Sequence, residues 1–251
     1  MRAVLQALAL PAAALLALEA WARTVGRHSD ALAAPSAAAL AWLEALHDGS
    51  LLQASAFTLG SALLGLLIGA AIGIPLGTWL GLSPRMARLG FVSIEAARPV
   101  PSVALIPLAM LVFGFGLGMQ VAVVAFACLW PLLLLTESAV RQVEPQWLAV
   151  ARALGLGPWQ RFAKVIAPAI VPRLFVALRI GLGVALVVAV TVELAANPHG
   201  MGYAMLIAQQ SLEPARMLAW LGWIGLVGVA LNAAALALQR AVARRMGEVP
   251  P

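Results

Sequence analysis

Long apolar runs, separated by short clusters of charged residues, dominate this sequence. Uncharged runs long enough for a transmembrane helix of about 20 residues lie between Asp48 and Arg85, between Arg98 and Glu137, and between Arg216 and Arg240. Two weaker runs occupy Ala3–Leu18 and the stretch from Arg179 to Glu193. The pattern predicts an all-α membrane protein with several spans.

The run that follows Arg98 is too long for one span. Residues 99–136 would form a helix of about 57 Å at 1.5 Å per residue, nearly twice the hydrocarbon thickness. The run must therefore fold back, and Gly114-Phe115-Gly116-Leu117-Gly118 is the expected turn because glycine tolerates positive φ and ends helices. This division predicts six transmembrane helices: Ala3–Trp21, Ala56–Leu80, Leu89–Phe113, Met119–Val140, Pro168–Ala195 and Met217–Gln239.

The six helices imply an order of segments along the chain. We expect a first helix with its flank in residues 1–30, an extracytoplasmic amphipathic segment in 31–55, a five-helix core in 56–245 and a cytoplasmic tail in 246–251. Arg2 followed by an apolar stretch that ends in small residues also fits a signal peptide, but we favour an uncleaved helix.

Composition and charge placement support a membrane location. Hydrophobic residues make up 63% of the chain and charged residues 10%, whereas soluble domains are roughly one quarter charged. With the N-terminus inside, eleven of the sixteen Lys and Arg residues fall in cytoplasmic segments, while only Arg23, Arg27 and Arg216 fall outside. We therefore expect a multi-pass membrane protein, in contact with lipid, with both termini cytoplasmic. The net charge of +6 then needs no nucleic-acid partner.

The sequence offers little for metal or cofactor chemistry. Its single cysteine, Cys128, excludes an intramolecular disulfide. His28, His47 and His199 all fall in predicted loops or outside segments, so no predicted helix carries a histidine that could bind haem or a metal. We expect no cofactor and no metal site.

An amphiphilic segment within the predicted cytoplasmic loop 144–168 holds the only lysine, Lys164. Pro145 suits the first turn of a short helix, which Gly155 would end in a left-handed cap. Pro158 suits the start of a second short helix. One face of the second helix would carry Trp159, Phe162 and Val165. Aromatic residues rimmed by basic ones mark either a membrane interface or a protein socket.

Glycine recurs every fourth residue in the second predicted helix, which also contains Pro75. Such a series permits close contact between helices in a membrane. It serves either tight packing within the chain or a sliding surface for alternating access. The series comprises Gly65, Gly69, Gly73, Gly77 and Gly81.

Four ionisable residues within spans are candidates for the transport pathway or a gate, because charge in a membrane is costly unless it is paired. Glu95 and Arg98 are spaced i, i+3 and could pair on one helix face, just before a break at Pro99. Arg179 either attracts an anionic solute or extends toward the cytoplasm. Glu193 serves either gating or structural hydrogen bonding.

The amphiphilic segment resembles the cytoplasmic loop of permease subunits from ATP-binding-cassette (ABC) importers. That loop reads E-A-A, three residues, G, nine residues, I-x-L-P. Ala149-Val150-Ala151, Gly155 and Val165-Ile166-Ala167-Pro168 stand at those spacings, with alanine in place of the acidic residue. The resemblance implies a coupling helix that docks on an ATPase, and it assigns the contact to Trp147, Ala149, Val150, Ala151, Arg152, Leu154, Gly155, Val165 and Pro168.

Further stretches, in order along the chain, resemble the nitrate, sulfonate and taurine branch of these permeases. They are Arg98-Pro99-Val100-Pro101, Ala104-Leu105-Ile106-Pro107, Phe113-Gly114-Phe115-Gly116, Val150-Ala151-Arg152-Ala153-Leu154-Gly155, Leu178-Arg179-Ile180-Gly181 and Gly200-Met201-Gly202-Tyr203. The resemblance implies a type I importer permease for a small anion, located in the bacterial inner membrane. Its implied partners are cytoplasmic ATPase subunits, an extracytoplasmic solute-binding protein and a second permease subunit, most simply a second copy.

Two observations on the sequence bear on how transport is powered. The chain has no G-x-x-x-x-G-K-[ST] phosphate loop, so it is not itself the ATPase and is not expected to be an enzyme. The alternative is a secondary transporter driven by an ion gradient, which would be expected to show internal repeats; no convincing repeat is visible.

Overall fold

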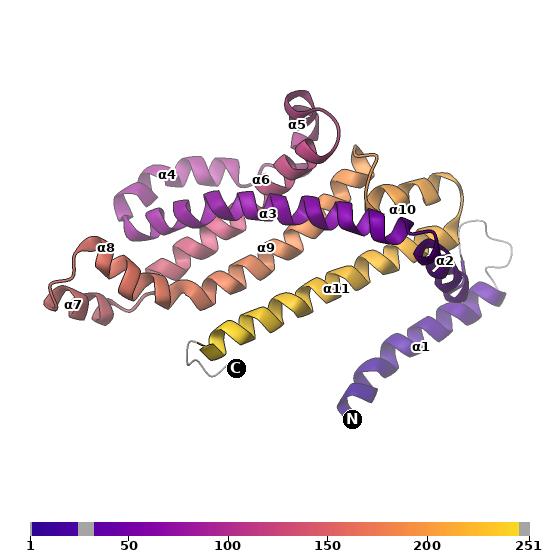
Figure 1. The fold of residues 1–251 in the computed structure, drawn as a ribbon, viewed down its shortest axis with the longest axis horizontal. Helices are drawn as coiled ribbons and strands as arrows, with labels where there is room; N and C mark the ends of the chain where they lie inside the picture. The colour runs from indigo at the N-terminus through magenta and orange to yellow at the C-terminus, as the bar shows by residue number, and fades with distance from the viewer. Residues whose placement is uncertain (1, 25–32, 246–251) are drawn as a thin grey trace. The chain divides into compact units, whose positions relative to one another are not determined.

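The computed structural model describes residues 2–24 and 33–245, and within these ranges it contains helices and no strands (Figure 1). The chain divides into two compact units. The first comprises Met1–Thr58 and Glu193–Val227, and the second comprises Leu59–Val192 and Gly228–Pro251. Arg27, the flank at residues 25–30 and the predicted tail at 246–251 lie outside the described residues.

Four helical segments among the described residues are long and apolar enough to cross a membrane. They are α3 (Ser50–Leu82), α6 (Leu117–Arg141), the continuous segment Pro158–Ala195, and α11 (Pro214–Arg245). Two further helical stretches, Pro84–Ala97 and Ser102–Phe113, meet at a bend and make a fifth span if together they cross the membrane once. The all-helical membrane fold is confirmed, and α1 (Arg2–Thr24) covers the first predicted helix.

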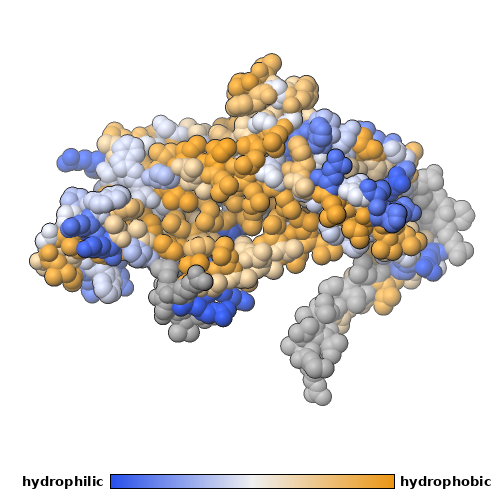
Figure 2. Space-filling model, viewed as in Figure 1, coloured by the Kyte–Doolittle hydropathy of each residue, from blue (hydrophilic) through white to orange (hydrophobic). Residues whose placement is uncertain are grey.

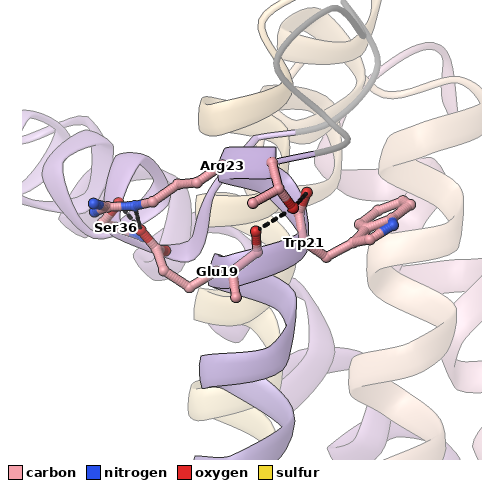
Figure 3. Close-up of polar contacts among 6 residues, drawn as sticks. Glu19, Trp21, Arg23 and Ser36 are labelled. Atoms are coloured by element: carbon pink, nitrogen blue, oxygen red, sulfur yellow. Dashed lines mark hydrogen bonds and ion pairs between the residues drawn. The ribbon is translucent and has the colours of Figure 1, made fainter.

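In the first unit, polar contacts fix the two ends of α2 (Pro35–His47). Figure 3 shows Glu19 of α1 beside Ser36, whose backbone N–H and hydroxyl donate to its carboxylate over 3.0 and 2.8 Å. At the other end, Asp48 accepts from the backbone N–H of Ser50 over 2.8 Å. Hydrogen bonds from the Ser50 side chain and backbone hold the pKa of Asp48 below its usual value. Since α2 ends at His47, the expectation that no helix carries a histidine is wrong.

The second unit is built on close contact between α3 and α6. A Cβ placed on Gly69 would lie 2.9 Å from the carbonyl oxygen of Ala125, and one on Gly73 equally near that of Leu129. The glycines thus let the two backbones approach to a distance that side chains would prevent. Gln120 of α6 donates to Ser61 of α3 over 2.8 Å, which satisfies a polar group buried in the bundle.

The third predicted span, Leu89–Phe113, is not one straight helix. It consists of α4 (Pro84–Ala97), a 3₁₀ turn η2 (Ser102–Leu105) and α5 (Ile106–Phe113), with a bend of 80°. Pro99 and Pro101 explain the break, because each lacks an N–H and disfavours helical geometry in the residue before it. The predicted glycine turn after α5 is confirmed, with φ of +71° at Gly114 and +111° at Gly116.

The fifth predicted helix begins earlier than the sequence indicates. α8 (Pro158–Arg161), a π turn η3 (Phe162–Ile166) and α9 (Ala167–Ala195) form one continuous segment, so the expected separate short helix is wrong. At the end of the π turn, the N–H of Ala167 donates to the carbonyl oxygen of Phe162, five residues back. This wider turn makes room for the ring of Pro168, which would clash in a regular α-helix.

Candidate functional site

The amphiphilic segment contains α7 (Pro145–Ala153), whose ends are set by local chemistry. Pro145 occupies the first turn, where its missing N–H does no harm. The helix stops at Gly155, which has φ of +71°. The N–H of Gly155 donates to the carbonyl oxygen of Arg152 over 3.0 Å, and the N–H of Leu156 donates to the carbonyl oxygen of Ala151 over 3.1 Å. These two bonds form a Schellman motif.

Two faces of α7 have different environments. Ala151 is 2% exposed, and Leu148 packs against a cluster that includes Val143 and Ile166. Beside this packed face, α7 and its C-cap carry three large apolar side chains, which we call the apolar ridge: Trp147, Val150 and Leu154, 61%, 55% and 71% exposed. Figure 2 shows apolar atoms among hydrophilic ones around α7 and α8. The side chains of the apolar ridge are thus exposed on a helix that is packed against the protein on another face, as expected for a surface that binds a partner.

A cavity of about 430 Å³ adjoins the apolar ridge. It is lined by Trp147, Val150, Ala151, Leu154, Leu156, Lys164, Val165 and Ala169. Arg152 lines a second cavity of about 390 Å³ together with Arg161 and Phe162. Among the described residues, Arg152, Arg161 and Lys164 take part in no ion pair within 4.0 Å.

The structure brings five of the nine predicted coupling residues to one cavity, namely Trp147, Val150, Ala151, Leu154 and Val165. The other four lie elsewhere in the segment. Ala149 and Arg152 are exposed on α7, Gly155 ends that helix, and Pro168 is exposed in the first turn of α9.

Three of the four candidate pathway residues form exposed or local contacts. Glu95 and Arg98 pair over 3.3 Å, and their side chains are 40% and 45% exposed. Arg179 of α9 donates from Nε to Oδ1 of Asn232 on α11 over 3.0 Å. Neither contact builds an enclosed polar site.

Glu193, the fourth candidate, has a different setting because it is 1% exposed. Its Oε2 accepts from the N–H of Gly202 over 2.9 Å and lies 3.0 Å from Oγ1 of Thr58. The N–H of Met201 donates to the same Thr58 oxygen over 2.9 Å. Sequence reasoning identified Glu193 but missed Thr58, Met201 and Gly202, because Thr58 is 135 residues away and the other two contribute backbone groups. Glycine at position 200 was the one available signal.

Comparison with known proteins gives consistent results. Residues 73–248 match the family described as the binding-protein-dependent transport system inner membrane component. The taurine transport system permease protein TauC of Escherichia coli is 31% identical over 202 residues, which cover 80% of this chain and 74% of that protein. The nitrate import permease protein NrtB of Leptolyngbya laminosa is 29% identical over 186 residues, 74% of this chain and 67% of that protein.

A solved structure shows the same fold. A chain of the MetNI methionine ABC transporter, in an inward-facing conformation, aligns with a TM-score of 0.67 and 20% identity. The alignment covers 74% of this chain and 92% of that chain.

Proposed function

Because the chain belongs to the family of binding-protein-dependent transport system inner membrane components, we propose that it conducts a small anion across the membrane. It is a permease subunit of an ABC importer, a multi-pass protein of the inner membrane, and a separate subunit hydrolyses the ATP. Family membership thus favours ATP hydrolysis, rather than an ion gradient, as the energy source for transport. The partners that the family implies are an ATPase and a binding protein.

The names of two relatives support an anionic substrate. One is named for taurine, which carries a sulfonate, and the other for nitrate. Uptake of labelled taurine, an alkanesulfonate and nitrate by cells with and without this chain and its cognate binding protein tests the assignment. Uptake restricted to a sugar or a cation would refute it.

The apolar ridge of α7 is the observation that carries our proposal for coupling. Trp147, Val150 and Leu154 are exposed on a helix whose other face is packed, as expected for side chains that fill a socket on a partner. We assign that socket to the ATPase subunit. Lys164 lines the cavity beside the ridge, so a socket with an acidic rim is complementary in charge.

The rest of the assembly follows from this assignment. We place α7 and both termini in the cytoplasm, and α2 and α10 (Met201–Gln210) on the outside, where the binding protein delivers the solute. A second permease subunit, most simply a second copy of this chain, completes the pathway. The five-helix core at 56–245 then carries transport, and the loop at 144–168 carries coupling.

Truncation of the apolar ridge tests the coupling proposal. In detergent or nanodiscs, Trp147→Ala and Leu154→Ala should each weaken ATPase binding by about tenfold or more, as expected for central interface residues. Trp159→Ala is the matched control, since Trp159 lies in the same segment, is 75% exposed and stacks on Phe162. Equal losses in all three variants would show that the effect is not specific to the ridge. Unchanged affinity in both ridge variants would exclude this surface.

A further inference from the structure

The first turn of α10 (Met201–Gln210) is held by two side chains from transmembrane helices. Glu193 lies near the end of α9, and Thr58 lies in α3. Together they accept the N–H groups of Met201 and Gly202, the first two residues of α10. We call Glu193, Thr58 and these two N–H groups the α10 latch.

The chemistry of the latch is complementary. A helix N-terminus carries partial positive charge and unpaired N–H groups, so a carboxylate there is favourable. The same contact offsets the burial of an anion in an apolar protein, which would otherwise be costly. The hydroxyl oxygen of Thr58 accepts from the backbone N–H of Met201. The same oxygen lies 3.0 Å from Oε2 of Glu193 and 3.1 Å from the carbonyl oxygen of Ala54, so its one hydrogen can be donated to either.

Gly200 is adapted to the latch in two ways. Its φ of +95° is a conformation that other residues rarely adopt. In addition, a Cβ at this position would overlap the carboxyl group of Glu193. Any side chain at position 200 would therefore displace either the carboxylate or the start of α10.

The position of α10 matters for the outer surface of this unit. One wall of a cavity of about 360 Å³ is formed by α10, through Tyr203, Ala204, Ile207 and Ala208, and the other walls by α2 and the starts of α3 and α11. Displacement of α10 would alter this cavity. Glu193 lies two residues before the end of the continuous helical segment Pro158–Ala195.

We propose that Glu193 is a positioning residue whose carboxylate, with Thr58, fixes α10 so that its outer surface receives the binding protein. The identity of the partner, the binding protein, rests on the proposed function. The contacts of the latch do not depend on the proposed function, because they lie within this chain. Glu193 thereby contributes to transport by holding α10 in place, without contact with the solute.

Two pairs of substitutions test the latch. Glu193→Asp keeps the charge but shortens the side chain, and Thr58→Val keeps the shape but removes the hydroxyl. Each should accelerate hydrogen exchange at residues 200–203 by about tenfold, while exchange within α9 stays unchanged. Thr58→Ser retains the hydroxyl and should behave as wild type. Thr191→Val is the matched control, because the Thr191 hydroxyl bonds only to Val187 of its own helix among the described residues.

The same variants, reconstituted with the ATPase, test the role. Glu193→Asp and Thr58→Val should raise the KM for loaded binding protein by about tenfold while ATP hydrolysis without binding protein stays within about twofold. Unchanged exchange at 200–203 would refute the latch. The positioning role would be refuted by faster exchange with an unchanged KM. It would also be refuted if ATP hydrolysis fell equally with and without binding protein. Failure of the wild-type complex to respond to any binding protein would instead contradict the proposed function.

Discussion

Gly155 and Gly157 lie two residues apart in the amphiphilic segment but differ in backbone conformation. Gly155 has φ of +71°, whereas Gly157 has φ of −66°, and a Cβ at either position would meet no atom within 4 Å. Alanine at position 155 should therefore cost about 1–2 kcal/mol in backbone strain, with no steric clash. Alanine at position 157 should be tolerated.

This difference predicts the behaviour of two variants. Gly155→Ala should loosen the end of α7, where Leu154 closes the apolar ridge, and weaken ATPase binding by up to about tenfold. Gly157→Ala should bind as wild type does. Titration of each variant with purified ATPase measures the effect, and equal affinities would show that the left-handed cap does not matter for docking.

Asp48 predicts a pH dependence at the junction of α2 and α3. Hydrogen bonds from the Ser50 side chain and backbone lower its pKa in the folded protein. The resulting stabilisation is present above the unfolded pKa, about 3.9, and is lost as pH falls through the lower folded value. The Tm difference between wild type and Asp48→Asn should therefore shrink as pH is lowered from about 6 toward 3. A difference that does not vary with pH would contradict this contribution.

At the scale of elements, the glycine series is a packing surface between α3 and α6. At Gly73 a Cβ would lie 2.9 Å from the Leu129 carbonyl oxygen and 3.2 Å from the Leu132 Cβ, so the two backbones would have to separate. Gly73→Ala should lower the free energy of unfolding by about 1–3 kcal/mol. Gly60→Ala, in the same helix but with no atom within 4 Å, should be neutral or slightly stabilising. Denaturant unfolding in detergent compares them, and equal stabilities would exclude tight packing at Gly73.

The elements also show which features local sequence can predict. The turns at Gly114, Gly116 and Gly155 can be predicted from sequence because glycine adopts positive φ more readily than other residues. The π turn before Pro168 cannot, because an i→i−5 hydrogen bond leaves no mark on composition. The partners of Glu193 were missed for another reason. They come together only when α3, α9 and α10 pack, and no spacing along the chain records that packing.

At the scale of the whole molecule, charge placement yields an orientation that contacts within the chain do not provide. Because Lys and Arg are retained on the cytoplasmic side, their placement predicts that α7 is inside and α10 outside. The chain is well suited to a direct test because it has one cysteine, Cys128, whose side chain is fully buried in α6. Its background reaction with a thiol reagent should therefore be low.

Two exposed glutamines provide matched labelling sites, Gln146 in α7 and Gln210 at the end of α10. In intact spheroplasts, a membrane-impermeant maleimide should label Gln210→Cys at once, but should label Gln146→Cys only after permeabilisation. The opposite pattern would place the apolar ridge outside, where no ATPase can reach it, and would remove the coupling proposal together with the orientation. The continuous segment Pro158–Ala195 is the one candidate span between the two sites among the described residues. Labelling of both sites from outside would therefore mean that this segment does not cross the membrane.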